Sequence, residues 1–174
     1  MLACISEKKR HACIGSDSLY IRIRQARTDD LETLYSIERE CFTLEAFTKD
    51  QLEYLLQNPK DIGLVARTDN EIAGFIIGRI HNHPTTRTAH VYTLDIAIKH
   101  RRKGIGLRLL KELEKRFVDN RAETCFLEAR RGNVAALELY QKHGYMKVGI
   151  LKDFYSKGVD GVRLMKKLPI PSQQ

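Results

Sequence analysis

Residues 95–107 read Asp-Ile-Ala-Ile-Lys-His-Arg-Arg-Lys-Gly-Ile-Gly-Leu, and this stretch decides the fold. An apolar run ends in a basic turn, two glycines follow at a spacing of two, and an amphipathic segment then begins. The order predicts a strand, a turn and a helix that starts near Gly104. Glycines let the backbone approach a ligand closely, and the unpaired N–H groups of a first helical turn attract anions. The turn is therefore a candidate phosphate site, although an ordinary strand-to-helix turn could use the same glycines.

The composition is that of a globular domain. The chain has 174 residues, of which 43% are hydrophobic and 30% are charged. No apolar run approaches the roughly 20 residues that a membrane-spanning helix needs, so we expect no membrane partner. The net charge of +8 favours anionic partners such as nucleotide phosphates, RNA or ribosome surfaces, without choosing among them.

The cysteines and the N-terminal segment indicate a cytoplasmic protein without a metal site. The four cysteines, at positions 4, 13, 41 and 125, form no Cys-x-x-Cys pair and have no paired histidine spacing, which argues against zinc. Residues 1–18 are basic but lack the apolar core of a signal peptide. We therefore expect an N-terminal extension over 1–18 and one domain over 19–174.

Periodicity along the chain predicts a mixed α/β domain. Thr48 and Gln51 have the spacing of a capping box, and Asn133 can cap a later helix. The predicted helices cover about 29–41, 48–57, 104–120 and 133–143. The predicted strands cover 20–24, 62–67, 72–80, 90–98, 124–129, 145–155 and 162–168, and those before the glycine turn follow one another as an antiparallel meander.

Two motifs now give the chain a family resemblance. Residues 101–106, Arg-Arg-Lys-Gly-Ile-Gly, match the acetyl-CoA signature Q/R-x-x-G-x-G/A of the GNAT superfamily of N-acetyltransferases. Residues 127–140 resemble the L-E-x-R-x-x-N-x-x-A-x-x-L-Y segment of ribosomal-protein alanine N-acetyltransferases, which belong with archaeal and other protein N-terminal acetyltransferases. The resemblance covers about residues 20–168. It implies an α/β (α+β) fold with a mainly antiparallel sheet of about seven strands flanked by four helices.

The resemblance also implies a binding site for acetyl-CoA. In such enzymes the backbone of the glycine turn holds the pyrophosphate, and the end of the preceding strand pairs with the pantetheine arm. Asn133 would help to position that arm, or it is simply a helix cap. The implied cofactor-binding residues are Ile96, Ala97, Ile98, Arg101, Arg102, Lys103, Gly104, Ile105, Gly106, Leu107 and Asn133.

Acetyl transfer to an amine requires proton transfer. A free α-amino group has a pKa of about 7.7–8.0, so a base must accept its proton and an acid can protonate the departing thiolate. The resemblance assigns the base to Glu128 and the acid to Tyr140, with His90 as a relaying group. Burial at the end of an apolar strand would raise the pKa of Glu128. The alternatives are an acid paired with Arg130, a core tyrosine and a surface histidine.

Two loops are expected to bind the acceptor. In the resembling enzymes they hold the first residues of a peptide, and here they contribute Phe42, Glu45 and Tyr155. Without that role these side chains are a solvated acid and ordinary loop and strand-end aromatics. The predicted activity is direct acetylation of protein N-termini, which ribosome association could accompany. The alternatives are acetylation of an internal lysine or small amine, and a basic RNA- or ribosome-binding module.

Overall fold

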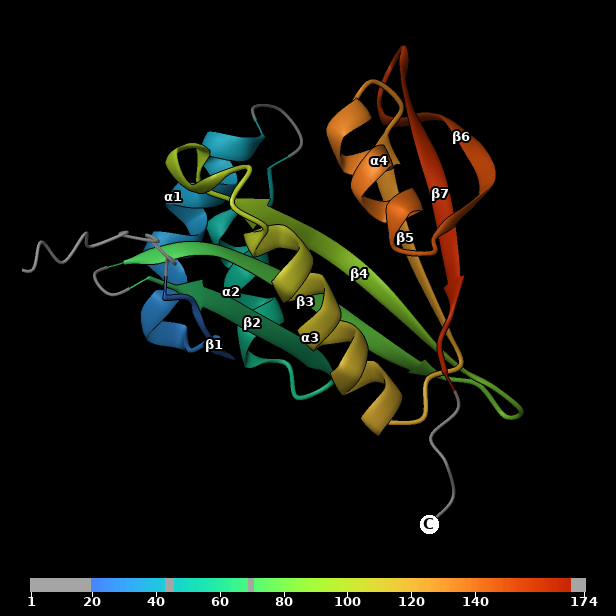
Figure 1. Ribbon diagram of the computed structural model, residues 1–174, viewed down its shortest axis with the longest axis horizontal. Coiled ribbons are helices and arrows are strands. Elements are labelled where there is room, and N and C mark those ends of the chain that lie inside the picture. Colours follow the sequence, from blue (N-terminus) through green and yellow to red (C-terminus); the bar gives the residue numbers. More distant parts are fainter. Residues whose placement is uncertain (1–19, 43–45, 69–70, 170–174) are drawn as a thin grey trace, which may run out of the picture.

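Seven strands form a single sheet in the computed structural model, which describes residues 20–42, 46–68 and 71–169 (Figure 1). The strands are β1 (Arg22–Gln25), β2 (Asp61–Arg67), β3 (Ile72–Asn82), β4 (Arg87–Ile96), β5 (Thr124–Arg130), β6 (Met146–Ser156) and β7 (Val159–Lys167). The helices are η1 (Thr28–Asp30), α1 (Leu31–Cys41), α2 (Lys49–Gln57), η2 (Ile98–His100), α3 (Ile105–Asp119) and α4 (Val134–Lys142), where η marks a 3-10 helix. The predicted fold is therefore confirmed, while the expected extension over 1–18 lies outside the described residues.

The strand order is β1-β2-β3-β4-β5-β7-β6. Strands β1 to β4 form the predicted antiparallel meander, and β5 then runs parallel to β4. The β4–β5 ladder is short, because it joins only residues 88–91 to residues 124–127. Beyond this ladder the two strands diverge, and Figure 1 shows β5, β6, β7 and α4 rising away from the other half of the sheet.

A bulge in β4 changes which face its side chains occupy. Ile77 of β3 is opposite Thr93 and Gly78 is opposite Val91, so Tyr92 is an extra residue in β4. A one-residue insertion reverses the inward and outward alternation of a strand. Val91 accordingly packs into one core and Ala97 into the other.

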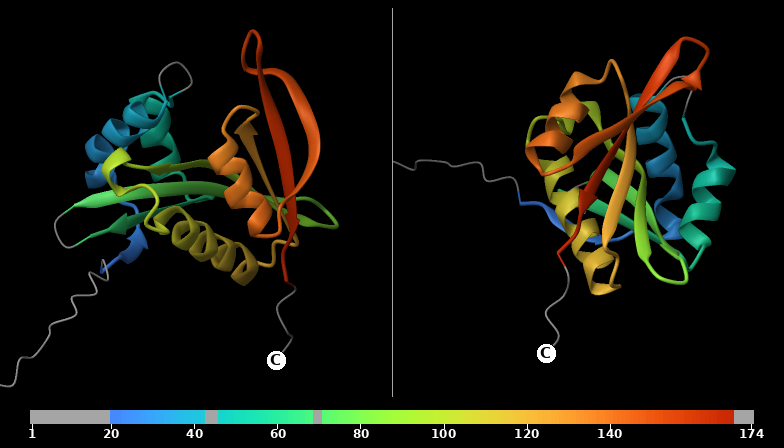
Figure 2. Two further views of the ribbon diagram at one scale, coloured as in Figure 1. Left: turned by 45° about the horizontal axis from the view of Figure 1, so that its top comes forward. Right: turned by 90° about the vertical axis from the view of Figure 1, so that its right-hand side faces the viewer.

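Two hydrophobic cores lie on opposite faces of the sheet (Figure 2). On one face α3 buries Leu109, Leu113 and Phe117 completely. On the other face α1 and α2 bury Leu34 and Leu52, also completely. Each such side chain contributes about 1.5–3 kcal/mol through removal of apolar surface from water. The helices therefore fix the sheet from both sides and leave the opening between β4 and β5 as the place for a ligand.

Some predicted boundaries were wrong for local reasons. The predicted strand 90–98 ends at Ile96, because η2 begins at Ile98 and the His100 N–H bonds back to Ala97 O at 2.8 Å. The last strand, β7, starts three residues earlier than predicted, since Gly158 adopts a φ of 82° and permits a tight turn after Ser156. A left-handed φ of this kind costs glycine little.

Candidate active site

The opening between β4 and β5 contains a cavity of about 300 Å³. Val91 and Leu127, which end the β4–β5 ladder, both line it. The cavity also brings together most of the predicted catalytic and acceptor residues, although they come from α1, β4, β5, α4 and β6. Those residues are Phe42, His90, Glu128, Asn133, Tyr140 and Tyr155. Glu45 lies outside the described residues.

Glu128 is held between two cationic or potentially cationic side chains. His90 Nε2 lies 2.6 Å from Glu128 Oε2 across the β4–β5 ladder. Arg163, directly opposite Glu128 in the β5–β7 ladder, donates from Nε to Oε1 at 2.7 Å. Glu128 is therefore paired with Arg163, whereas one alternative from the sequence paired it with Arg130.

These partners reverse the expected shift of the Glu128 pKa. Burial alone would raise it, since the side chain is only 7% exposed. The hydrogen bonds and charges of His90 and Arg163 together outweigh burial and lower the pKa of this carboxyl below its ordinary value. The raised pKa that we expected from burial is therefore wrong. An ionised Glu128 has no proton to donate, so the proton of the short contact belongs to His90 Nε2 and Nδ1 is left as an acceptor.

Tyr140 approaches the cavity from α4. The residue is buried, and its ring centroid lies 5.7 Å from that of Tyr145 in an edge-to-face arrangement. Burial raises the pKa of the Tyr140 hydroxyl far above its ordinary value. The hydroxyl therefore keeps its proton at neutral pH, which a general acid requires.

The basic turn leads from the cavity side of β4 to the first turn of α3. Arg102 and Gly104 have positive φ angles of 59° and 75°, and α3 begins directly afterwards at Ile105. The N–H groups at the start of an α-helix have no partner within the helix. They and the exposed Arg102 and Lys103 form a site whose chemistry fits a pyrophosphate.

The end of β4 has less free backbone than we expected. The N–H of Ala97 is bonded to β3, so Ala97 cannot offer it to a ligand. Ile96 and Ile98 present their groups away from β3, where Ile96 O accepts from Arg101 Nε at 3.1 Å and the Ile98 N–H donates to Glu40 Oε1 at 3.0 Å. Of the three predicted pairing residues, Ala97 has its N–H occupied by β3, and Ile96 and Ile98 carry side-chain partners.

Asn133 caps α4, which is one of the two roles that the sequence predicted for it. Its side-chain oxygen accepts the Ala136 N–H at 3.2 Å, which caps α4. It also lines the cavity, so both of its predicted roles are geometrically compatible.

Sequence reasoning missed several cavity residues. Glu38 and Thr93 line the cavity but belong to no motif that we used, whereas Phe47 and Phe154 lie in the two segments that were expected to bind the acceptor. A signal existed for Glu38, since it lies four residues after Leu34 on the apolar stripe of α1, where a buried acid is unusual. Arg163 had no comparable signal, because its role depends on a strand pairing that the local sequence does not show.

The described residues contain neither a metal-binding cluster nor a membrane-spanning helix. Within them, no group of three or more His, Cys, Asp or Glu side chains is placed to hold a metal ion. No helix in the same part of the chain is long and apolar enough to cross a membrane.

The chain is similar to known proteins both in sequence and in fold. The family model described as "Acetyltransferase (GNAT) family" matches residues 31–145. An N-alpha-acetyltransferase of Saccharolobus solfataricus is 32% identical over 158 residues, covering 84% of this chain and 92% of that protein. A putative [ribosomal protein bS18]-alanine N-acetyltransferase of Bacillus subtilis is 28% identical, covering 82% and 92% respectively. The crystal structure of the ribosomal-protein-S18-alanine N-acetyltransferase from Escherichia coli shares the fold with a TM-score of 0.77 at 20% identity, covering 89% of this chain and 98% of that one.

Proposed function

Since this chain belongs to the acetyltransferase (GNAT) family, we propose that it transfers an acetyl group from acetyl-CoA to the N-terminal α-amine of proteins. The observation that carries the proposal is the cavity between β4 and β5, where the His90–Glu128 pair and Tyr140 come together. The N-terminal acceptor is supported by the name of the relative from S. solfataricus, an N-alpha-acetyltransferase.

Acetyl-CoA supplies the acetyl group as an activated thioester. The N–H groups of residues 102–107 are suited to its pyrophosphate, because they lie in a left-handed turn and the first turn of α3. The outward backbone groups of Ile96 and the side chain of Asn133 are suited to its amide-bearing arm. Arg101 would then exchange its bond to Ile96 O for contacts with the ligand.

The His90–Glu128 pair is the proposed proton acceptor. The ionised carboxylate orients His90 through Nε2, so the free Nδ1 lone pair can take a proton from the incoming amine. Glu128 stabilises the positive charge that then forms on the imidazole ring. Base catalysis of this kind typically contributes on the order of 10² to 10⁴ in rate.

Tyr140 is the proposed acid. Tyr140 lines the same cavity, and burial keeps its hydroxyl protonated. The proposed role of this hydroxyl is to donate a hydrogen bond, and then its proton, to the negative sulfur as the C–S bond breaks. The proposed base pair joins His90 of β4 to Glu128 of β5, and the proposed acid comes from α4.

Aromatic side chains form the proposed acceptor wall. Phe42 follows α1, and Phe154 and Tyr155 belong to β6, so the two groups face the cavity from opposite halves of the molecule. Rigid aromatic side chains suit a short peptide segment, since they lose little conformational entropy on binding. Glu45 remains a proposed contact to the amine.

A peptide-library acetylation assay tests this function. We expect mass spectrometry to find the acetyl group on free N-terminal amines, with strongly reduced rates for Glu128→Gln and Tyr140→Phe. Acetylation confined to internal lysines or small amines would overturn the proposed acceptor. Full activity in both variants would overturn the proton-transfer roles and leave the binding site standing.

We also propose that the enzyme works in the cytoplasm and contacts ribosomes. The relative from B. subtilis is named for a ribosomal protein. In addition, α3 presents an exposed row of cations, Arg108, Lys111 and Lys115, beyond the turn assigned to acetyl-CoA. With a rise of 1.5 Å per residue, Lys115 lies roughly 15 Å along the axis from Ile105, too far to serve the same pyrophosphate. RNA phosphates are the proposed partner of this row.

A further inference from the structure

A buried chain of polar groups connects α1 to β4 beneath the cavity. Glu38 and Asp95 are each 1% exposed, and Thr93 between them is 6% exposed. Thr93 Oγ1 lies 2.5 Å from Asp95 Oδ2 and 3.5 Å from Glu38 Oε2. The other oxygen of Glu38, Oε1, accepts the backbone N–H of Phe47 at 2.9 Å.

Two buried carboxyls this close cannot both be ionised. Burial raises the pKa of both groups, and the neighbouring Glu38 charge raises the pKa of Asp95 further. Glu38 receives the Phe47 N–H, which favours its ionised form, so the shared proton belongs to Asp95. A neutral Asp95 can then donate to Thr93, and Thr93 can donate to the Glu38 carboxylate.

The bond between Glu38 and Phe47 ties α1 to the segment just before α2, next to the cavity. Helix α1 ends at Cys41, and α2 starts at Lys49. Phe42 and Phe47, near the two ends of the connection, both line the cavity, as does Glu38 itself. A charged acceptor makes a stronger bond to a backbone N–H than a neutral one.

We propose that Glu38 is a positioning residue for the acceptor, which holds Phe42 and Phe47 in place as the cavity wall. The inference rests on the proposed function, because it assigns this wall to the acetylated peptide. Glu38 acts through the loop and touches neither the acetyl donor nor the proton-transfer groups. Its bond to Phe47 should therefore affect binding of the peptide and leave the chemical step largely intact.

Three variants separate this role from a general loss of stability. Glu38→Leu removes the acceptor for Phe47, Glu38→Gln retains an oxygen without the charge, and Asp95→Asn imitates the neutral Asp95. For Glu38→Leu we expect the KM for peptide to rise about tenfold to a hundredfold, with kcat and the Kd for acetyl-CoA little changed. Glu38→Gln should recover part of the loss, and Asp95→Asn should resemble the wild type.

Amide hydrogen exchange provides a second measurement that does not depend on activity. The Phe47 N–H should be protected in the wild type and in Asp95→Asn, and it should exchange much faster in Glu38→Leu. Unchanged peptide KM together with unchanged Phe47 protection would overturn the inference, even if the variant melted at a lower temperature. A wild type that acetylates no N-terminal peptide would instead refute the proposed function, and the exchange experiment would still decide the role of Glu38 in the loop.

Discussion

Two side chains, Arg163 and His90, bind the carboxylate of Glu128, the proposed partner of the base. His90 and Arg163 bind different oxygens of the carboxylate, so each can be changed while the other remains. The arginine side chain is 45% exposed, which means that its replacement leaves no buried cavity. Glu128 is therefore a residue whose electrostatics can be tested without disturbing the fold.

Replacing Arg163 should change the pH dependence of the reaction. Loss of its charge raises the pKa of Glu128, so in Arg163→Met the acidic limb of kcat/KM should move to higher pH. Arg163→Lys retains the charge and serves as the control. An acidic limb at the same pH in all three proteins would show that Glu128 does not control the rate.

Gly106 tests the proposed pyrophosphate site. A Cβ at this position would make ordinary contacts of 3.7–3.9 Å with Ile96 and Leu139, so Gly106→Ala should fold and bind. In Gly106→Asp the carboxylate would repel the phosphates, and we expect acetyl-CoA binding to be nearly abolished. Calorimetric titration measures both variants, and equal affinity in the aspartate variant would mean that the phosphates bind elsewhere.

Asp95 should make the protein less stable as the pH rises. Its pKa is raised in the folded state, so between about pH 4 and that higher value the folded chain holds a proton that the unfolded chain has released. This difference lowers the free energy of unfolding with increasing pH. Urea denaturation at about pH 5 and about pH 8 measures how much the free energy of unfolding falls between the two pH values, and this fall should be smaller for Asp95→Asn than for the wild type. An equal fall in the two proteins would mean that the shared proton belongs to Glu38.

At the scale of elements, the local sequence controls where helices begin more strictly than how strands pair. Thr48 and Gln51 form the predicted capping box, with the Gln51 N–H donating to Thr48 Oγ1 at 3.2 Å and the Thr48 N–H donating to Gln51 Oε1 at 2.8 Å. The start of α1 is different, because Asp30 bonds back to the Arg27 N–H and to both terminal nitrogens of Arg24. A turn of 3-10 helix therefore precedes α1.

The capping box should be measurable in the stability of the whole domain. Thr48→Ala removes the acceptor for the Gln51 N–H and should lower the free energy of unfolding by about 1 kcal/mol. Thr85→Ala, in the exposed loop between β3 and β4, is a control that should change it by less than about 0.5 kcal/mol. Equal urea midpoints for Thr48→Ala and the wild type would contradict the capping role.

The sequence could predict the elements that depend on local signals, but it could not predict the contacts between distant segments. The helices, the meander and the glycine turn follow from caps, periodicity and Gly104, which are local signals. The insertion of β7 between β5 and β6 depends on pairing between distant segments, so the partner of Glu128 could not be found in advance. Likewise, Glu38 could be noticed as an acid on an apolar stripe, but its bond to Phe47 required the folded loop.

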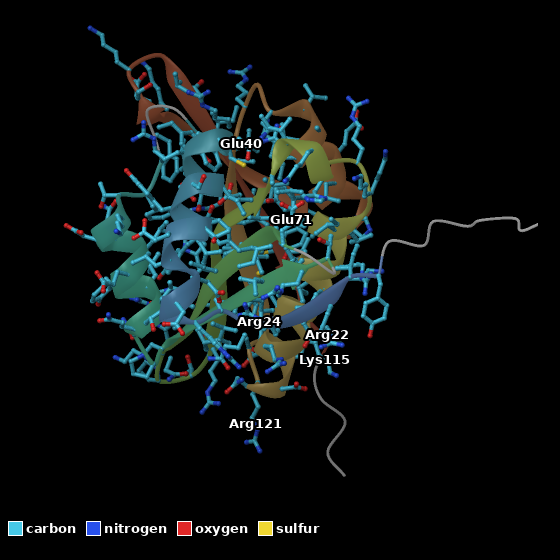
Figure 3. All side chains as sticks on the ribbon, turned by 90° about the vertical axis from the view of Figure 1, so that its left-hand side faces the viewer. Arg22, Arg24, Glu40, Glu71, Lys115 and Arg121 are labelled. Atoms are coloured by element: carbon cyan, nitrogen blue, oxygen red, sulfur yellow. The ribbon has the colours of Figure 1, made fainter. Side chains whose placement is uncertain are left out.

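At the scale of the whole molecule, the charges labelled in one side view separate by sign. Figure 3 shows Arg22, Arg24, Lys115 and Arg121 in the lower part of that view, while Glu40 and Glu71 lie in its upper part. Arg24 is paired with Asp30, and Glu71 is paired with Lys99 and His100. Lys115 is exposed and belongs to the row of α3 cations proposed above to contact RNA.

Charge reversal should separate RNA binding from catalysis. We expect Lys111→Glu combined with Lys115→Glu to weaken binding to ribosomal RNA and to flatten its salt dependence, because fewer counterions are released. Lys60→Glu combined with Lys152→Glu changes the net charge equally and should have a smaller effect. Peptide acetylation should be unchanged in both double variants. Equal losses of RNA affinity would indicate attraction by net charge alone, which would refute a specific α3 surface.

The divergence of β4 from β5 also has a consequence for self-association. A sheet that splits in its middle has two inner edges in addition to its outer ones, and an open edge is a template for foreign strands. At the inner edge of β4, Arg101 and Glu40 occupy Ile96 O and the Ile98 N–H. With these groups already bonded, the inner edge of β4 offers fewer free backbone groups to a foreign strand. The positions proposed for the acetyl donor are therefore also positions at which strand addition is disfavoured.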